Sequence, residues 1–147
     1  MSDVKTVTIV GSRKLQVLPQ AVLEFLMELP PRSMILLRKG VTTHPGRFEQ
    51  MVAACCTDMW LAWEWVEPEL NGDPGTVFNR DVAMVGRSDC VLAFFAEEVM
   101  SGGTEHVVEK AIDQTVPVYS YGLRDGHFIR IGEHDPASAW SRLAPRG

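Results

Sequence analysis

Short apolar runs alternate with amphipathic stripes along most of this chain. Such runs, continuous and apolar at 34–37 and rich in β-branched residues at 4–10, are typical of buried strands. The chain predicts strands over residues 4–10, 34–37, 60–66, 89–95 and 115–121. Between these runs, apolar residues recur at spacings of three and four, as amphipathic helices require. They predict helices over residues 17–29, 48–55, 77–87 and 105–114. The tail adds a hairpin strand over 127–131 and a short helix over 136–143.

Segment 60–66 has two interpretations. It follows a helical stripe closely and could extend that helix. Its tryptophans, however, alternate with Glu64, and aromatic residues at alternate positions favour a strand. We therefore assign this segment as the third strand.

The order of these elements predicts the fold. Strands that alternate with helices form parallel βαβ units joined by right-handed crossovers. The expected fold is α/β, a three-layer, Rossmann-like, doubly wound and mainly parallel sheet of about five strands. A length of 147 residues with 46% hydrophobic content suits one compact domain. We expect a single domain over residues 1–147, with its core at about 4–121 and a C-terminal extension over 122–147.

The charge balance limits the partners. A net charge of −5 and a pI near 5.3 argue against a protein that holds nucleic acid or an anionic membrane by bulk electrostatics. The N-terminal segment lacks the basic flank and apolar core of a signal peptide, and no apolar run approaches a membrane span. We therefore expect a cytoplasmic protein without a membrane or nucleic-acid partner. Open sheets of this kind commonly form homo-oligomers, although no segment marks an interface.

The sequence lacks the motifs of several common kinds of catalytic and metal site. Cys55, Cys56 and Cys90 are an odd number of cysteines without metal-ligand spacing, and each lies among apolar residues, so we expect buried thiols and no metal site. The chain has no Walker A sequence, no Gly-x-Ser-x-Gly elbow and no full Gly-x-Gly-x-x-Gly fingerprint. These absences argue against a P-loop NTPase, an α/β-hydrolase and a standard NAD dehydrogenase, and no cofactor is expected.

Small and basic residues fill three of the turns that follow predicted strands. Ligands of doubly wound sheets bind beyond the carboxyl ends of the strands, where these turns should meet. A small-residue turn that opens a helix presents free N–H groups and a positive dipole end, so it suits an anion such as phosphate. The three turns are Gly11-Ser12-Arg13, Arg38-Lys39-Gly40 and Ser101-Gly102-Gly103-Thr104.

Longer stretches around these turns suggest a family. The chain carries, in order, VTIVGSR, LLRKGVTTHPGRFE, NRDVAMVGRSDCVLAFF and SGGTEHVVEKA, within residues 5–121. In order and spacing these stretches resemble the SLOG superfamily, the Rossmann-like domains related to the DNA-processing protein DprA and to the cytokinin-activating LOG proteins. The resemblance is closer to the small stand-alone branch related to YspA and YpsA. It implies a Rossmann-like domain that binds a nucleotide or a nucleotide-derived small molecule.

The resemblance also implies residue roles. The pocket would consist of glycine turns and arginines at matching positions: Gly11, Ser12 and Arg13 on one wall, Gly40 on the second turn, Arg80 before the fourth strand, and Gly103-Thr104 as the phosphate-binding turn.

Two motifs depart from the family pattern. The small branch usually carries Arg-Gly-Ala-Asp on the second loop, whereas this chain has Pro-Gly-Arg-Phe-Glu over residues 45–49, so only Glu49 could replace the acid. LOG proteins end the motif Pro-Gly-Gly-x-Gly-Thr-x-x-Glu in a catalytic glutamate. Val107 stands at that position here, flanked by Glu105 and Glu109.

Charged residues near the turns have alternative roles. Arg13, Lys39 and Arg80 could donate hydrogen bonds to phosphate, or could be ordinary structural or solvated charges. Glu49 and Glu105 could grip ribose hydroxyls or perform acid–base work, or could interact with the dipoles of their helices.

Three functional hypotheses follow. The first is a binding module that holds a nucleotide or nucleotide-derived signal across the glycine turns, with Arg13 and Arg80 meeting phosphate. The alternative is an enzyme that cleaves or transfers the N-glycosidic bonds of nucleotides, like a phosphoribohydrolase or a 2-deoxyribosyltransferase. In that enzyme Glu49 or Glu105 would stabilise an oxocarbenium-like sugar or activate water. The third is a domain that has lost its ligand and acts through a protein partner.

Overall fold

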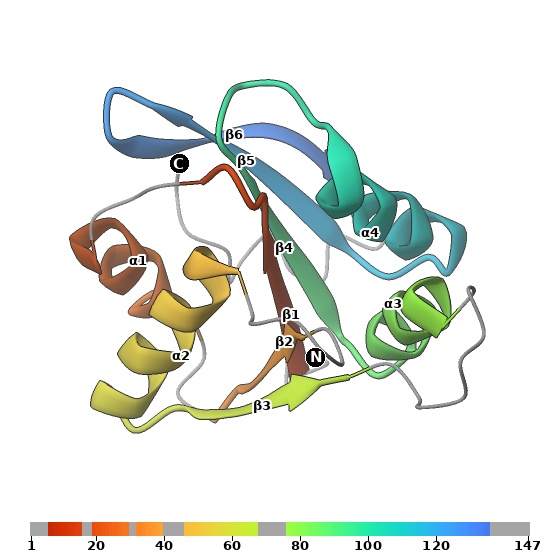
Figure 1. The fold of residues 1–147 in the computed structure, drawn as a ribbon, viewed down its shortest axis with the longest axis horizontal. Coiled ribbons are helices and arrows are strands. Elements are labelled where there is room, and N and C mark those ends of the chain that lie inside the picture. The colour runs from red at the N-terminus through yellow and green to blue at the C-terminus, as the bar shows by residue number, and fades with distance from the viewer. Residues whose placement is uncertain (1–5, 16–18, 30–31, 40–45, 68–75, 136–147) are drawn as a thin grey trace.

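The computed structural model describes residues 6–15, 19–29, 32–39, 46–67 and 76–135. Within these residues, strands and helices alternate as predicted (Figure 1). The strands are β1 (Thr6–Gly11), β2 (Met34–Arg38), β3 (Ala62–Val66), β4 (Cys90–Phe95), β5 (Val118–Arg124) and β6 (His127–His134). The helices are α1 (Pro19–Leu26), α2 (Arg47–Asp58), α3 (Thr76–Gly86) and α4 (Gly102–Asp113).

The strands form one six-stranded sheet in the order β3-β2-β1-β4-β5-β6. Every neighbouring pair from β3 to β5 is parallel, and β6 pairs antiparallel with β5. This arrangement confirms the predicted α/β class and the doubly wound, mainly parallel sheet. The sheet also takes in β6, which lies in the segment expected to be an extension. The helix predicted over residues 136–143 lies outside the described residues.

The β5–β6 hairpin depends on a two-residue turn. Asp125 and Gly126 adopt φ angles of 50° and 80°, and the flanking residues Arg124 and His127 pair across the hairpin. Asp-Gly is a preferred sequence for such a turn because both central residues need positive φ. The turn brings the chain back antiparallel and adds the sixth strand.

Segment 60–66 contains a strand, as the tryptophan alternation predicted. Helix α2 ends at Asp58, and β3 begins at Ala62. Trp60 lies in the connection between them with a φ of 60°, and its side chain is 95% exposed. Trp63 and Trp65 pack against the core from one face of β3, with ring centroids 5.2 Å apart.

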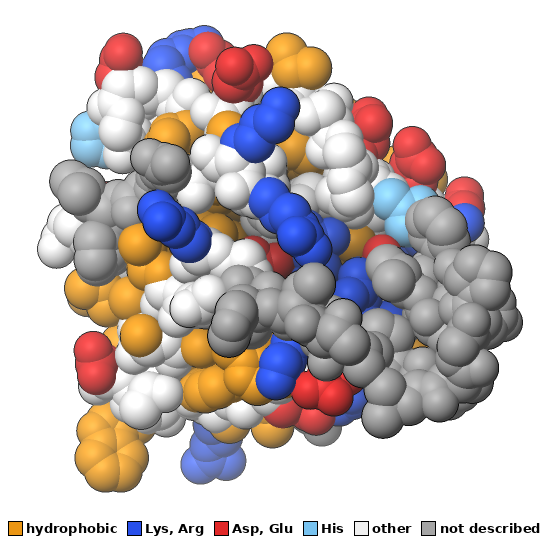
Figure 2. Space-filling view, viewed as in Figure 1, with side chains coloured by type: hydrophobic (Ala, Val, Ile, Leu, Met, Phe, Trp, Pro, Cys, Tyr) orange, Lys and Arg blue, Asp and Glu red, His pale blue; other side chains and the backbone are white. Residues whose placement is uncertain are grey.

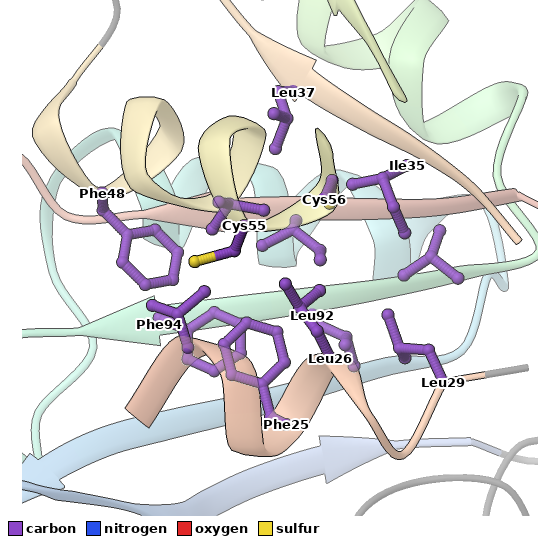
Figure 3. Packing of buried hydrophobic residues seen from close by; sticks show 14 of the residues in the cluster. Phe25, Leu26, Leu29, Ile35, Leu37, Phe48, Cys55, Cys56, Leu92 and Phe94 are labelled. Atoms are coloured by element: carbon purple, nitrogen blue, oxygen red, sulfur yellow. The ribbon is translucent and has the colours of Figure 1, made fainter. Parts of the chain in front are cut away.

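The helices cover the two faces of the sheet in pairs. Helices α1 and α2 lie on one face, and α3 and α4 lie on the other (Figure 1). The core beneath α1 and α2 is rich in aromatic side chains (Figure 3). The ring of Phe94 lies 4.6 Å from that of Phe25, 5.1 Å from that of Phe48 and 4.8 Å from that of Phe128, centroid to centroid. These contacts fix the position of Phe48 at the start of α2.

All three cysteines are buried free thiols, which confirms the sequence-based prediction. Burial raises the pKa of each thiol, and that of Cys56 reaches about 12. Such thiols stay protonated and unreactive near neutral pH. No helix in the described part of the chain is long and apolar enough to cross a membrane.

Candidate functional site

The strand order reverses between β1 and β4, and we call the region beyond the carboxyl ends of these two strands the crevice. Strands β2 and β3 lie on one side of β1, whereas β4, β5 and β6 lie on the other. In open α/β sheets this reversal is the usual ligand site. The amide of Ser12, just after β1, donates to the carbonyl of Phe94 near the end of β4 at 2.9 Å. The turns that follow β1 and β4 therefore leave the sheet side by side.

Arg38, the last residue of β2, connects the elements around this crevice. Its Nη2 donates to the Gly11 carbonyl at 2.9 Å and to Thr104 Oγ1 at 2.7 Å. Its Nε donates to Glu49 Oε2 at 3.1 Å. One guanidinium thus contacts the end of β1, the first turn of α2 and the first turn of α4. Arg38, the first residue of the second predicted turn, therefore contacts a residue of the first turn and a residue of the third.

The sequence predicts a turn at Arg38 but indicates no role for this residue. It is the first charged residue after the buried run of β2, whose central residues are fully buried. A charged residue at the carboxyl end of a buried strand is a recognisable signal. The contacts with Gly11 and Thr104 could not be predicted, because these residues lie 27 and 66 positions away in sequence.

The N-terminus of α4 is open. Ser101 precedes the helix in an extended conformation and makes no side-chain capping bond. Gly102 and Gly103 are both exposed, and a Cβ on Gly102 would meet no atom within 4 Å. The first N–H groups of a helix lack partners within the helix and carry its positive dipole end. This open end suits an anion.

Arg38 and Thr104 lie directly beside that open end. A Cβ on Gly103 would lie 3.7 Å from Arg38 Nη1, and Nη1 has no hydrogen-bond partner among the described residues. Thr104 is buried, and its Oγ1 accepts a hydrogen bond from Arg38 instead of capping the helix. Its hydroxyl hydrogen is left to donate elsewhere. The Arg38 guanidinium and the Thr104 hydroxyl therefore lie next to the N-terminus of α4.

The turn after β1 is filled by protein. A Cβ on Gly11 would lie 2.3 Å from Cδ2 of Phe48, so glycine is required there by the core ring. Ser12 is half-buried, and its Oγ accepts a hydrogen bond from the Lys14 amide at 3.2 Å. Arg13 is exposed and forms no ion pair within the described residues. Arg13 is thus available at the rim of the crevice, whereas Gly11 serves packing.

The second predicted turn is only partly described. Lys39 forms an ion pair with Glu67 at 3.3 Å, and the Lys39 side chain is 33% exposed. Gly40, a predicted pocket residue, lies outside the described residues. Lys39 therefore lies at the carboxyl end of β2 with a partner of its own.

Arg80 lies close to the end of β2 but is engaged by protein groups. Its Nε and Nη2 both donate to Asp81 Oδ1, at 3.0 and 2.8 Å, and its Nη1 donates to the Lys39 carbonyl at 3.3 Å. Both side chains of the Arg80–Asp81 pair are buried. In this arrangement Arg80 holds the backbone where β2 ends, and Asp81 balances its charge.

The two candidate carboxylates differ in environment. Glu49 is buried in the first turn of α2, where burial raises the pKa of its carboxyl and Arg38 offsets part of that rise. Glu105 is half-buried in the first turn of α4. A buried carboxyl with a raised pKa beside a crevice has the properties of a general acid, but the Arg38 contact also gives it a structural task. Glu105 is placed to interact with the helix dipole.

Lys and Arg side chains lie among uncharged side chains in the middle of the face shown in Figure 2. Most Asp and Glu side chains lie towards the margins. A local basic region on a chain of net charge −5 favours an anion bound at one place rather than across the whole surface. Among the described residues, no group of three or more His, Cys, Asp or Glu side chains could hold a metal ion.

Comparisons with known proteins identify no relative. A scan against protein-family models, a search of curated proteins and a search of solved structures each find no match for this chain.

Proposed function

We propose that the crevice between β1 and β4 binds a nucleotide or a nucleotide-derived small molecule, with a phosphate group at the N-terminus of α4. The observation that carries this proposal is the position of Arg38. Its guanidinium links the ends of β1, α2 and α4 and leaves Nη1 without a described partner beside Gly103. A phosphate there would receive hydrogen bonds from Nη1, from the Thr104 hydroxyl and from the first N–H groups of α4.

Residues at the rim would extend this site. Arg13 and Ser12 follow β1 directly, and Lys39 follows Arg38. An exposed guanidinium and a partly exposed ammonium can meet further phosphates or ribose oxygens without the cost of burying a charge. The predicted SLOG resemblance is in keeping with this arrangement, since it assigns a nucleotide to the same turns. We propose membership of that superfamily on the same grounds.

Calorimetric titration tests the proposal. AMP, ADP, ADP-ribose and inorganic phosphate would be titrated into the whole chain. We expect heat from at least one nucleotide, and its absence at millimolar ligand would refute the proposal. Thr104→Val should weaken binding about tenfold, because it removes one hydroxyl worth about 1.4 kcal/mol in a charge-assisted contact.

A matched control exists on β1. Thr8 is also a buried threonine, and its hydroxyl bonds to Ser88 rather than to any group at the crevice. Thr8→Val removes a buried hydroxyl just as Thr104→Val does, so both variants should lose some stability. Only Thr104→Val should change the affinity. Equal affinities in both variants would remove Thr104 from the site.

One observation favours a second candidate, an enzyme that cleaves or transfers N-glycosidic bonds of nucleotides. Glu49 has a buried carboxyl with a raised pKa at the edge where the sugar would lie. Such a group could protonate a leaving base, and the carboxylate left after this proton transfer could stabilise an oxocarbenium-like sugar. Incubation with nucleoside monophosphates and chromatography of the released base would detect this activity. Release that survives both Glu49→Gln and Glu105→Gln would exclude these two carboxylates as the catalytic groups.

A further inference from the structure

Strand β3 forms one edge of the sheet, and its outer side has no partner among the described residues (Figure 1). The Lys39 amide donates to the Val66 carbonyl at 3.0 Å, so the backbone polar groups of Val66 face β2. Because these groups alternate along a strand, those of Glu64 and Ala62 face β2 as well. The N–H and C=O groups of Trp63 and Trp65 therefore point away from the sheet.

This edge carries little of the protection that exposed edges usually have. It contains no proline and no lysine, and its only charged residue, Glu64, is paired with Arg87. Trp63 and Trp65 lie together on the opposite face of the strand, partly buried against the core. Trp60, in the connection before β3, is 95% exposed. An unblocked, aromatic edge strand is a template for pairing with another strand.

The sequence of β3 is close to a palindrome. It reads Ala-Trp-Glu-Trp-Val, with Glu64 at its centre. We propose that β3 pairs with β3 of a second copy of this chain, antiparallel and around a two-fold axis at Glu64. A two-fold interface brings the same patch of both copies together, so it requires a self-complementary surface. A strand that reads nearly alike in both directions provides one.

The backbone directions agree with this register. Antiparallel pairing centred on Glu64 sets Trp63 opposite Trp65 of the second copy, and Trp65 opposite its Trp63. Both residues direct their N–H and C=O groups outward, so each facing pair exchanges two hydrogen bonds. A shift of one residue would set inward-facing groups against the new partner and lose these bonds. The two six-stranded sheets then become one continuous sheet.

The side chains agree as well. On one face, the tryptophans of the two copies form a cross-strand cluster that buries aromatic surface left partly exposed in one copy. On the other face, Glu64 meets Glu64 of the second copy. Like charges directly opposite each other destabilise a sheet, but each carboxylate already carries Arg87 as its counter-ion. The pairing of Glu64 with Arg87 thus permits the two-fold contact.

A cysteine cross-link tests the register directly. Residues opposite each other without mutual hydrogen bonds have Cα atoms about 4.5 Å apart, within the range that a disulfide spans. Glu64→Cys should therefore give a covalent dimer on mild oxidation with oxidised glutathione. Ala62→Cys is the matched control, since the two copies of that position would lie about 13 Å apart. The native cysteines are buried and should not contribute.

A measurement of mass completes the test. Sedimentation of the unmodified chain should show a concentration-dependent dimer. Trp65→Pro removes an outward N–H without removing a bond to β2, so the fold should survive, as circular dichroism can check. It should favour the monomer more than Trp65→Ala, which loses the same ring but keeps the N–H. Monomeric wild-type protein, or equal cross-linking of Glu64→Cys and Ala62→Cys, would overturn the proposal, whether or not nucleotides bind.

Discussion

The glycine turns after β1 and after β4 leave the same edge of the sheet from neighbouring strands. Gly11 is buried, and the position of its missing Cβ is filled by the ring of Phe48 at 2.3 Å. Gly102 and Gly103 are exposed, and their missing Cβ atoms would meet no atom closer than 3.7 Å. The first turn is closed by the protein's own core and the second is open to a ligand. Glycine in a strand-to-helix turn therefore does not by itself indicate a phosphate site.

The largest expected effect is at the closed turn. Gly11→Ala would place a methyl carbon 2.3 Å from Cδ2 of Phe48. That ring cannot move freely, because it packs against Phe94 and Phe128. We expect a loss of about 3 kcal/mol in the free energy of unfolding, the upper part of the usual range for overpacking. Urea denaturation followed by circular dichroism would measure it.

A second substitution separates packing from other causes. Phe48→Leu replaces the ring beside Gly11 with a smaller side chain. The double variant Gly11→Ala/Phe48→Leu should therefore lose less unfolding free energy than the two single variants lose together. Additive losses would mean that Gly11 is required for a reason other than this contact, and the contrast between the two turns would fail.

The next effect belongs to the open turn. Gly102 adopts a φ of 70°, a left-handed conformation that L-residues with a Cβ avoid. Gly102→Ala should cost about 1 kcal/mol of unfolding free energy through backbone strain alone, since the added Cβ meets no atom. Gly102→Asn should cost less, because asparagine tolerates this conformation. Equal losses in the two variants would contradict a purely conformational origin.

The local pattern of apolar and polar residues was sufficient to predict most of the fold. Apolar runs predicted the five parallel strands, and the alternation of Trp63 and Trp65 with Glu64 distinguished β3 from a continued helix. The hairpin strand predicted over residues 127–131 is confirmed as β6, although its place as a sixth strand of the main sheet was not predicted. Its pairing with β5 depends on the positive φ angles at Asp125 and Gly126, which bring a polar tail segment back onto the sheet edge. Periodicity alone does not state where a tail will pair.

The site was predicted only in outline. The strand order brings the turns after β1 and β4 together, as expected from topology. The roles of individual residues depend on contacts across long separations in sequence. Phe48 fills the space at Gly11, and Asp81 with the Lys39 carbonyl engages Arg80. In the sequence, Arg38 cannot be distinguished from other charged turn residues, because its partners lie on other elements.

A smaller effect concerns Glu49, which meets the guanidinium that joins the two turns. Because burial raises its pKa above the ordinary value of 4.5, the folded protein keeps a proton there that the unfolded chain has released. Stability from this group is complete below pH 4.5 and falls as pH rises through the folded pKa. Glutamine at this position cannot titrate. The free energy of unfolding of Glu49→Gln, relative to that of the wild type, should therefore increase as pH rises from 4.5 through the folded pKa of Glu49. Urea denaturation at several pH values would measure the difference, and a constant difference would contradict a raised pKa.

The smallest effect on stability is expected at Gly103, where the effect on binding should be clear. The added Cβ of Gly103→Ala would make an ordinary contact with Arg38 Nη1, so the free energy of unfolding should change by no more than about 0.5 kcal/mol. The same Cβ would occupy space beside Nη1, where the proposed anion would bind, so nucleotide affinity should fall about tenfold, which is about 1.4 kcal/mol. Gly86→Ala changes a glycine at the end of α3, whose Cβ would approach only Gln114, and should leave affinity unchanged. Calorimetry on both variants decides the matter: an unaltered affinity in Gly103→Ala would mean that the open turn, although accessible, is not where the anion binds.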